Sequence, residues 1–326
     1  MTLNILENLA PALNQAWPGV SNTAWRFVLT TAAGENRCDA KVTVFVFNVA
    51  DAVPLGVLKT SLTADDRWLK NQYNILQFLD RLPIEGILYP RPIAIIENEQ
   101  YRFYLESYVE AKPVFHYGKR LHAVMLWAVE WLTNLHRVTS SFNESAIQDL
   151  SALLTTWWSV IEHARCLKSE VIHAARSVVE NALVATGALP TVFMHGDFHP
   201  NQFLRTDKAR GVGIVDWEHA ACRGWPVLDL IELLATTAYL DGKYTSTPHA
   251  FQSLFMQPKP HPSVAGFLEN YWQQLKLPMD SLKIFLGVYC LHSLAQIIAL
   301  RGDILPIPAI IDWSYLLLKA WRLVEI

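Results

Sequence analysis

Two aspartates, each of which follows a short apolar stretch, are the residues best suited to chemistry. Asp197 stands in FMHGDFHPNQFL (residues 193–204), and Asp216 stands in GIVDWEHA (residues 213–220). The apolar residues before each aspartate predict a β-strand, so each carboxylate should be delivered where a strand ends. The turn between positions 197 and 216 predicts that the two strands pair as a hairpin, with the aspartates side by side. A pair of carboxylates placed in this way can hold a hard divalent cation over a polyphosphate.

Two histidines lie beside the first aspartate. We expect His195 to organise its loop through a hydrogen bond to the backbone near Asp216, and not to act as a general base. His195 and His199 are four residues apart, a spacing that binds zinc on a helix. However, Gly196 and Pro200 disfavour a helix at this position. The sequence therefore favours a loop here over a zinc site.

The elements before these loops are mostly β-strands. Runs rich in β-branched and aromatic residues predict five strands, and apolar residues spaced by three and four predict one helix after the third strand. Lys59 falls on that third strand, and a short peripheral amphipathic helix is predicted within residues 1–22. The predicted strands cover residues 25–34, 41–50, 55–62, 90–99 and 101–110, and the predicted helix covers residues 64–82.

From about residue 108 the pattern becomes helical. The chain has 326 residues, more than one compact core usually holds. We therefore predict an α+β protein with two lobes. A small antiparallel β-sheet with one main helix occupies residues 1–107, and a larger, mainly helical lobe at residues 108–326 carries both aspartate loops. The helices predicted in this second lobe cover residues 121–136, 146–186 (one or two helices), 227–240, 264–275, 282–300 and 307–324.

Composition narrows the classes of function. Hydrophobic residues make up 52% of the chain and charged residues 17%, as is typical of a well-buried globular protein. A formal net charge of −3 without a long basic run argues against nucleic-acid binding. The four cysteines include no C-x-x-C pair, so we expect reduced thiols in a cytoplasmic protein. The N-terminus lacks a basic signal-peptide region, and polar residues interrupt the most apolar helix, so no membrane span is predicted.

Together these motifs resemble the aminoglycoside phosphotransferase and choline-kinase-like family, which has a protein-kinase-like fold. HGDFHP at residues 195–200 is similar to the catalytic loop of that family, and IVDWEHA at residues 214–220 is similar to its metal-binding loop. LTNLHR at residues 132–137 and GWPVLDLIELLA at residues 224–235, which contains Asp229, resemble two further stretches of these enzymes. The likeness covers most of the chain from about Trp25 onward.

The resemblance implies an ATP-dependent phosphotransferase that acts on a hydroxyl of a small molecule, such as a sugar, an amino alcohol or an aminoglycoside-like compound. Asp197 would accept or orient the proton of the attacking hydroxyl. Asp216 would bind the Mg²⁺ that bridges the phosphates of ATP or of another nucleoside triphosphate. Lys59 would contact the α- and β-phosphates.

Further nucleotide contacts are implied near a hinge and a glycine turn. Adenine would lie at the hinge, residues 106–111, which includes Glu106 and Tyr108, and backbone groups there would recognise its edge. The loop that contains Gly34 would cover the phosphates with backbone N–H groups. For Glu218 we expect an exposed carboxylate of no special role, and the other alternative is that it assists the metal or a substrate.

The sequence departs from the family pattern at two positions. A metal-binding Asn is expected five residues after the catalytic Asp, but Gln202 stands there and Asn201 lies one residue early. Either Gln202 would bind the metal, or Asn201 would do so through a shortened loop. The helix after Lys59 should present a Glu to the lysine, but Gln72 stands there. Both changes favour a competing hypothesis, a pseudokinase-like protein that binds nucleotide or regulates another process.

A third hypothesis is a metal-dependent hydrolase that uses both histidines and both aspartates, and it would require tight retention of zinc or manganese. The chain contains no G-x-S-x-G, P-loop or G-x-G-x-x-G motif, so serine-hydrolase, P-loop and Rossmann interpretations have no support. The helical lobe would recognise the hydroxyl acceptor, but no stretch in it indicates a particular acceptor or oligomeric state.

Overall fold

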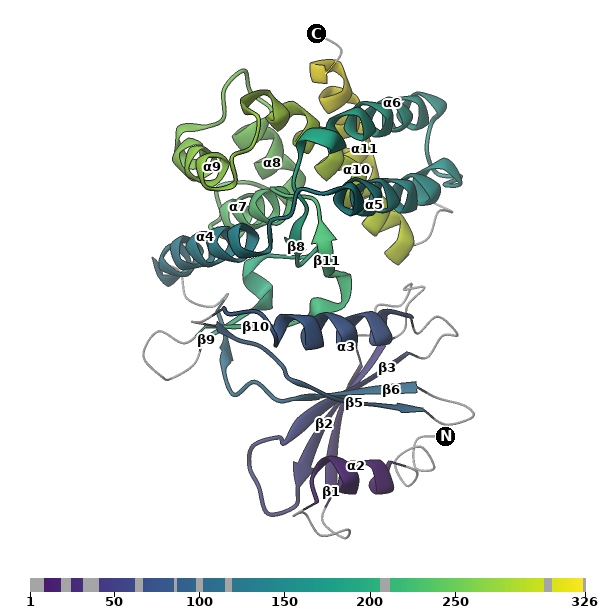
Figure 1. The fold of residues 1–326 in the computed structure, drawn as a ribbon, viewed down its shortest axis with the longest axis vertical. Helices are drawn as coiled ribbons and strands as arrows, with labels where there is room; N and C mark the ends of the chain where they lie inside the picture. Colours follow the sequence, from purple (N-terminus) through teal and green to yellow (C-terminus); the bar gives the residue numbers. More distant parts are fainter. Residues whose placement is uncertain are drawn as a thin grey trace. The chain divides into compact units, whose positions relative to one another are not determined.

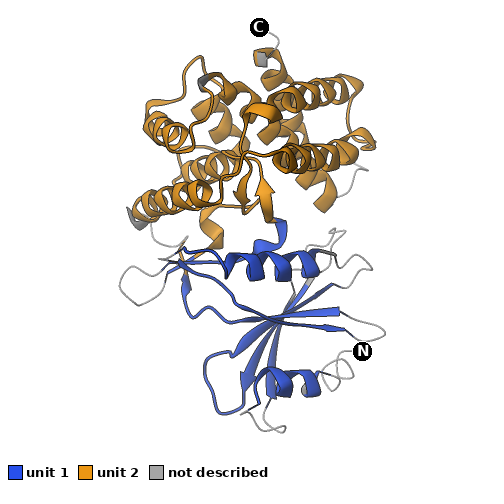
Figure 2. Cartoon of the chain, viewed as in Figure 1, with its two compact units in different colours: residues 1–112, 204–219 blue, residues 113–203, 220–326 orange. Residues whose placement is uncertain are grey.

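The structure is a computed structural model of the chain, and it divides into two compact units (Figure 2). Unit 1 contains residues 1–112 and 204–219, and unit 2 contains residues 113–203 and 220–326. The return of residues 204–219 to the first unit was not expected from the sequence. The structure describes residues 9–18, 25–31, 41–61, 67–84, 87–97, 102–114, 119–205, 212–301 and 307–324.

Unit 1 is built on a five-stranded antiparallel sheet (Figure 1). Lys59 on the third strand pairs with Thr43 on one side and with Tyr104 on the other. The prediction of five strands and of the place of Lys59 among them is confirmed. In spatial order the strands are β1 (Trp25–Thr31), β2 (Lys41–Asn48), β3 (Gly56–Ser61), β6 (Arg102–Ser107) and β5 (Pro92–Glu97).

The two faces of this sheet are covered by different helices (Figure 1). Apolar side chains from β2, β3 and β6 form a cluster with Leu9 and Leu13 at α2 (Ala10–Ala16). This cluster includes Leu58, Phe103 and Leu105. Because side chains alternate along a strand, the residues between these, among them the lysine of β3, point to the other face. Helix α3 (Arg67–Leu79) packs on that face.

A smaller sheet continues unit 1. Its order is β4 (Ile87–Leu88), β10 (Val212–Ile214), β9 (Phe203–Arg205) and β7 (Lys112–Pro113), and the chain passes between the units within β7 and β9. Strand β10 runs parallel to β4. The short helix η3 (Trp217–His219) follows β10 and contacts α3. The segment that carries Asp216 is therefore integrated into the first unit.

Unit 2 is mainly helical, as predicted, and α10 lies among α5, α6, α7 and α11 (Figure 1). The sequence did not predict α8, although Ser246 caps it and Pro248 lies in its first turn, which is a recognisable helix start. The helices are α4 (Lys119–Thr139), α5 (Glu144–Glu162), α6 (Ser169–Ala185), α7 (Leu228–Leu240), α8 (Thr247–Phe255), α9 (Pro262–Leu275), α10 (Leu282–Arg301), α11 (Pro308–Val324) and the short η1 (Thr186–Ala188), η2 (Pro200–Gln202) and η4 (Met279–Ser281).

The stretch Leu282–Leu300 of α10 is both long and apolar. Within the described ranges it is the single stretch that could cross a membrane by length and composition, and 67% of it is buried inside the protein. A core helix of a globular protein has the same properties.

The hairpin predicted for the two aspartates is wrong. The strand before Asp197, β8 (Val192–Met194), pairs antiparallel with β11 (Ala221–Gly224) in a separate two-stranded sheet. The strand before Asp216, β10, lies between β4 and β9 instead. Apolar lead-in residues indicate that a strand is present, but they do not indicate which distant strand it pairs with.

Candidate active site

Lys59 lies on the face of the sheet that α3 covers. Tyr104 and Glu106 of the neighbouring strand β6 share this face. Tyr104 is directly opposite Lys59 in the register, and Glu106 is two residues farther along β6. Long side chains can interact at that diagonal position. The register of two strands therefore places an ammonium group beside a carboxylate.

The ammonium group of Lys59 has two carboxylates near it. Its Nζ is 3.0 Å from Oε1 of Glu106 and 3.9 Å from Oδ1 of Asp216. The side chains of Lys59 and Glu106 are only 13% and 4% exposed, whereas that of Asp216 is 41% exposed. The Glu106 pair is thus shielded from water, and the carboxylate of Asp216 remains open to solvent.

These charges keep Lys59 protonated. Burial alone would lower the pKa of Lys59, but Glu106 and then Asp216 more than offset this effect, and the pKa lies above its ordinary value. Burial raises the pKa of Glu106, and the lysine opposes that rise. Burial and then Glu106 raise the pKa of Tyr104, which stays a neutral phenol. A lasting cation at this position is suited to contact phosphate oxygens.

Gln72 occupies the buried side of α3. Its Nε2 donates a hydrogen bond of 3.0 Å to Oε2 of Glu106. The two oxygens of Glu106 therefore have different partners, the lysine and the glutamine. Gln72 stands where the family pattern has a glutamate. In the structure its amide holds Glu106 of strand β6.

Asp216 lies two residues beyond the end of β10 and has a constrained backbone. Its φ is 67°, in the left-handed region that few non-glycine residues adopt. Trp217 is fully buried, and its Nε1 donates to the backbone oxygen of Ile214 at 3.0 Å. The buried indole anchors the backbone from which the exposed carboxylate of Asp216 projects.

Glu218 is largely buried, so the alternative of an exposed carboxylate is wrong. Its side chain is 9% exposed, and Oε1 lies 3.3 Å from Nε2 of His219. Asn71 of α3 donates to the backbone oxygen of Glu218 at 3.3 Å. The charge of Glu218 also helps to raise the pKa of Lys59.

In unit 2, Asp197 lies in the loop between β8 and η2. Gly196 before it has a φ of 81°, which a glycine adopts without strain. The two oxygens of Asp229, at the start of α7, accept the backbone N–H of His195 at 2.7 Å and that of Gly196 at 2.9 Å. Nδ1 of His195 accepts the backbone N–H of Asp197 at 3.3 Å. Asp229 and His195 together determine the conformation of this loop.

Asp229 is itself held by a buried polar group. Nε2 of His136 lies 3.7 Å from Oδ2 of Asp229. Nδ1 of His136 contacts the hydroxyl of Tyr271, which also accepts the backbone N–H of Val227 at 3.0 Å. Burial would raise the pKa of Asp229, but the hydrogen bond and charge of His136 and then the interaction with His195 bring it below its ordinary value. Asp229 is therefore an ionised carboxylate.

Both carboxylate oxygens of Asp197 have partners from its own loop. Nε2 of His199 lies 3.2 Å from Oδ1, and Nε2 of Gln202 donates to Oδ2 at 2.8 Å. Nδ1 of His199 accepts the backbone N–H of Asn201 at 3.2 Å, so the proton of a neutral imidazole lies on Nε2 and points to Asp197. The side chain of Asn201 is exposed. Of the two amides considered, Gln202 is the one whose side chain reaches the aspartate.

Glu232, one turn beyond Asp229 on α7, is a polar neighbour that the sequence did not indicate. It accepts hydrogen bonds from Thr236, at 2.7 Å, and from the hydroxyl of Tyr289. Burial raises its pKa, the charge of His199 lowers it, and the charge of Asp197 raises it further. Glu232 could have been identified from the sequence, because a residue three positions after Asp229 on a helix lies on the same side of that helix.

Helix α10 also supports the loop. Nε2 of Gln296 donates to the backbone oxygen of Gly196 at 2.9 Å, and Nε2 of His292 lies 3.3 Å from the same oxygen. The ring of His292 packs on Trp157 with 4.6 Å between centroids. In the sequence these polar residues stand out only as interruptions of an apolar helix. They are four residues apart and therefore lie on the same side of the helix, which could have indicated that this side contacts a polar group.

The predicted site residues divide between the two units. Tyr108 follows β6, and its ring lies edge-on to Phe45 with 6.0 Å between centroids. Gly34 lies outside the described residues. The side chain of Glu106 faces the lysine, so a contact with adenine at this residue would depend on its backbone. The nucleotide roles of these residues stay predictions. Unit 1 contains Lys59, Gln72, Glu106, Tyr108, Asp216 and Glu218, and unit 2 contains His195, Asp197, Asn201 and Gln202.

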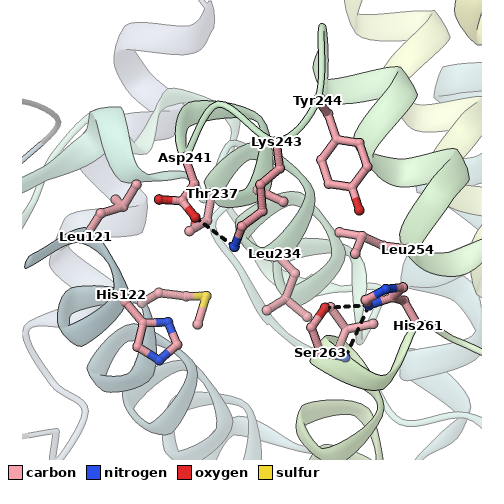
Figure 3. Close-up of a pocket in the computed structure, with 13 residues that line it drawn as sticks. Leu121, His122, Leu234, Thr237, Asp241, Lys243, Tyr244, Leu254, His261 and Ser263 are labelled. Atoms are coloured by element: carbon pink, nitrogen blue, oxygen red, sulfur yellow. Dashed lines mark hydrogen bonds and ion pairs between the residues drawn. The ribbon is translucent and has the colours of Figure 1, made fainter. Parts of the chain in front are cut away.

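A pocket of ≈ 230 Å³ lies within unit 2 and is lined by α4, α7, α8, α9 and the turn after α7 (Figure 3). Its apolar lining consists of three leucines with Met125, Ala238 and Val264, and its polar groups include an ion pair of 2.7 Å between Lys243 and Asp241. Thr237 lines the pocket, and its buried hydroxyl makes no hydrogen bond within the described part of the protein. A ligand with both apolar and hydrogen-bonding parts fits this lining.

Each unit by itself offers few candidate metal ligands, and these are oxygens, which suit magnesium. Within the described ranges, no group of three or more His, Cys, Asp or Glu is placed to hold a metal ion. Asp216 offers an exposed carboxylate, and Gln202 offers an amide oxygen in addition to the nitrogen bonded to Asp197. Mg²⁺ takes few protein oxygens and completes its shell with phosphate and water.

Solved structures define the class of fold. A putative fructosamine-3-kinase from Haemophilus somnus aligns with a TM-score of 0.60 and 11% identity over 96% of each chain. The aminoglycoside phosphotransferase APH(3'')-Id from Streptomyces rimosus aligns with a TM-score of 0.44 and 17% identity over 96% of this chain and 99% of that one. A spectinomycin phosphotransferase in complex with ADP and spectinomycin aligns with a TM-score of 0.46 and 12% identity, over 98% of each chain. The first comparison shows a kinase-like fold.

The sequence defines the family. Residues 56–253, which include Lys59 and both aspartate loops, match the model described as "Phosphotransferase enzyme family" (APH). This range is more than half of the chain, and the protein belongs to that phosphotransferase family. A search among curated proteins found no match.

Proposed function

We propose that the protein is an ATP-dependent kinase that phosphorylates a hydroxyl group of a small molecule. The observation that carries the proposal is the geometry of Asp197. Its loop is fixed by Asp229, and its two oxygens are oriented by His199 and Gln202. A carboxylate held in this way can orient an acceptor hydroxyl and take its proton. Membership of the phosphotransferase family supports the same reaction.

Each unit carries a different part of the proposed activity. In unit 1, Lys59 would contact the α- and β-phosphates, residues 106–111 including Tyr108 would bind adenine, and Asp216 would hold Mg²⁺. In unit 2, Asp197 would act on the acceptor, and the amide oxygen of Gln202 would serve as a further magnesium ligand. The bound Mg²⁺ would neutralise phosphate charge, which is its main contribution in phosphoryl transfer.

The pocket beneath α7 is our candidate for the non-reacting part of the acceptor. Helix α7 begins beside the catalytic loop with Asp229, and the residues from Leu234 to Asp241 line the pocket. Apolar walls suit the flat faces of a sugar ring or a carbon chain, and Thr237 can bond a hydroxyl or an amine. A sugar or an amino alcohol of modest size therefore agrees with the volume of ≈ 230 Å³.

The geometry favours catalysis over the pseudokinase-like alternative. That hypothesis depended on glutamines at positions 72 and 202. Gln202 bonds Asp197 directly, and Lys59 has a carboxylate partner in Glu106. Lys59 therefore keeps a carboxylate partner although position 72 is a glutamine, and Gln202 lies beside the proposed catalytic aspartate.

The proposal is tested by separating nucleotide binding from chemistry. We expect Asp197→Asn to lower kcat by about 10²–10⁴-fold, because the proton acceptor is lost, while MgADP still raises the Tm of the protein. Asp216→Asn and Lys59→Ala should abolish the magnesium-dependent rise in Tm. Turnover is measured as ATP consumption with a panel of sugars, amino alcohols and aminoglycosides.

Asp312→Asn is the matched control, since Asp312 is exposed on α11. It should leave turnover and the MgADP effect unchanged. Wild-type turnover in Asp197→Asn or Asp216→Asn would contradict the proposed function.

A further inference from the structure

We infer that Glu106 on strand β6 supplies the carboxylate that positions Lys59, in place of a glutamate on helix α3, and that Gln72 orients this carboxylate. The inference depends on the proposed function, in which Lys59 contacts the nucleotide phosphates. The acid therefore comes from the strand, and the helix supplies an amide.

The contacts of Glu106 account for both of its oxygens. Oε1 is 3.0 Å from Nζ of Lys59, and Oε2 accepts the amide hydrogen of Gln72 at 3.0 Å. The side chain is 4% exposed, so water cannot replace either partner. A buried carboxylate needs a donor on each oxygen, and here one of the two donors is the ammonium group of Lys59.

With the glutamate on β6, the ion pair of Lys59 depends on the sheet and not on the position of a helix. In protein kinases the glutamate lies on a mobile helix, so the lysine is positioned only when that helix is correctly placed. Here Lys59 and Glu106 lie on adjacent strands of one sheet, with Val57 opposite Glu106 in the register. Backbone pairing between β3 and β6 fixes the register of these two side chains. Lys59 is therefore held for phosphate binding without a contribution of charge from α3.

A residue swap tests this inference. Glu106→Gln should weaken MgADP binding by about tenfold or more, because the lysine loses its buried partner. Gln72→Glu should also weaken binding, since it sets two carboxylates against each other. The double variant Glu106→Gln/Gln72→Glu again places one acid and one amide beside Lys59, and its Kd should return to within about threefold of the wild-type value.

Thermal unfolding without nucleotide gives a second readout. Glu106→Gln should lower the Tm by roughly 5–10 °C, and the double variant should recover at least about half of that loss. Glu97→Gln and Asn74→Glu are the matched controls, because Glu97 forms an exposed ion pair with Arg102 and Asn74 is exposed on α3. Both controls should leave Tm and Kd unchanged.

The outcomes are distinguishable. Additive losses in the double variant, or a wild-type Kd in Glu106→Gln, would overturn the inference, and rescue of Tm without rescue of Kd would reduce Glu106 to a structural residue. If Glu106→Gln does not fold, Gln72→Ala tests the same contact, and an unchanged Kd in that variant would count against it. A wild-type protein that binds no MgADP would refute the proposed function, and the Tm measurements would still decide whether Glu106 holds Lys59.

Discussion

At the scale of single residues, Asp229 shows how a buried carboxylate can determine the conformation of a loop, here the one that carries Asp197. It accepts two backbone N–H groups and has His136 beside it, and these contacts overcome the cost of its burial. Lys59 and Glu106 are also buried charges, and they offset the cost of burial by forming a direct ion pair. In both cases a buried charge is tolerated because each polar atom has a partner.

Asp229→Asn should destabilise the protein by about 2–3 kcal/mol, because one of two charge-assisted hydrogen bonds is lost. The pKa of Asp229 is lowered from 3.8, so its contribution to stability is present above that pH and is lost as the pH falls through the folded-state pKa. The difference between wild type and variant should therefore shrink in acid. Urea unfolding of both proteins, from about pH 3 to about pH 7, measures it. A difference that does not change with pH would contradict the assignment.

At the scale of elements, the pairing of β8 with β11 places the loop that carries Asp197. The two strands approach closely at Gly224, where an added Cβ would lie 2.3 Å from Cβ of Met194. Met194 is the last residue of β8, and His195 follows it. The packing of the two strands at Gly224 therefore affects the geometry of the loop that carries Asp197.

Gly224→Ala should destabilise the protein by about 1–3 kcal/mol through this overlap and should lower kcat. Gly266→Ala is the contrasting substitution, since Gly266 is exposed within α9 and nothing lies within 4 Å of an added Cβ. It should stabilise the protein by about 0.5–1 kcal/mol because alanine favours a helix. Urea unfolding midpoints measure both effects, and a stable Gly224→Ala variant would argue against close packing of β8 and β11.

At the scale of the whole molecule, residues far apart in the sequence form features that no single segment contains. Residues 204–219 join a unit that otherwise ends at residue 112. The pocket of unit 2 draws its lining from α4, α7, α8 and α9 (Figure 3). Its one buried hydroxyl without a partner in the described structure, that of Thr237, is a direct probe of whether an acceptor binds there.

For an acceptor identified by ATP consumption, Thr237→Val should raise KM by about tenfold and leave kcat nearly unchanged, because a binding contact is lost without a change of shape. The Tm should not fall, since an unpaired buried hydroxyl is removed. Thr133→Val is the matched control: Thr133 is also buried, but it donates to the backbone oxygen of Val129 and does not line the pocket. An unchanged KM in Thr237→Val would place the acceptor elsewhere.

Much of the fold could be predicted from local patterns. The five strands of unit 1, the helix after Lys59 and most helices of unit 2 follow from hydrophobic periodicity, which reflects one buried side per element. The two aspartates were recognisable because apolar strands deliver them into polar loops. Helix α8 was missed although its start is marked by Ser246 and Pro248. The partner strand of β8 was predicted wrongly, because pairing between distant strands leaves no local signal.

The sequence by itself determined the types of residue available and the periodicity of the elements that carry them: a lysine on the third strand and two aspartates after apolar strands. Only the tertiary structure decided which groups meet. Glu106 stands 47 positions after Lys59 and reaches it because β3 and β6 are neighbours in one sheet. Gln296 bonds Gly196 across 100 residues of chain. Contacts of this kind depend on packing between elements, and a linear pattern of residue types does not contain that information.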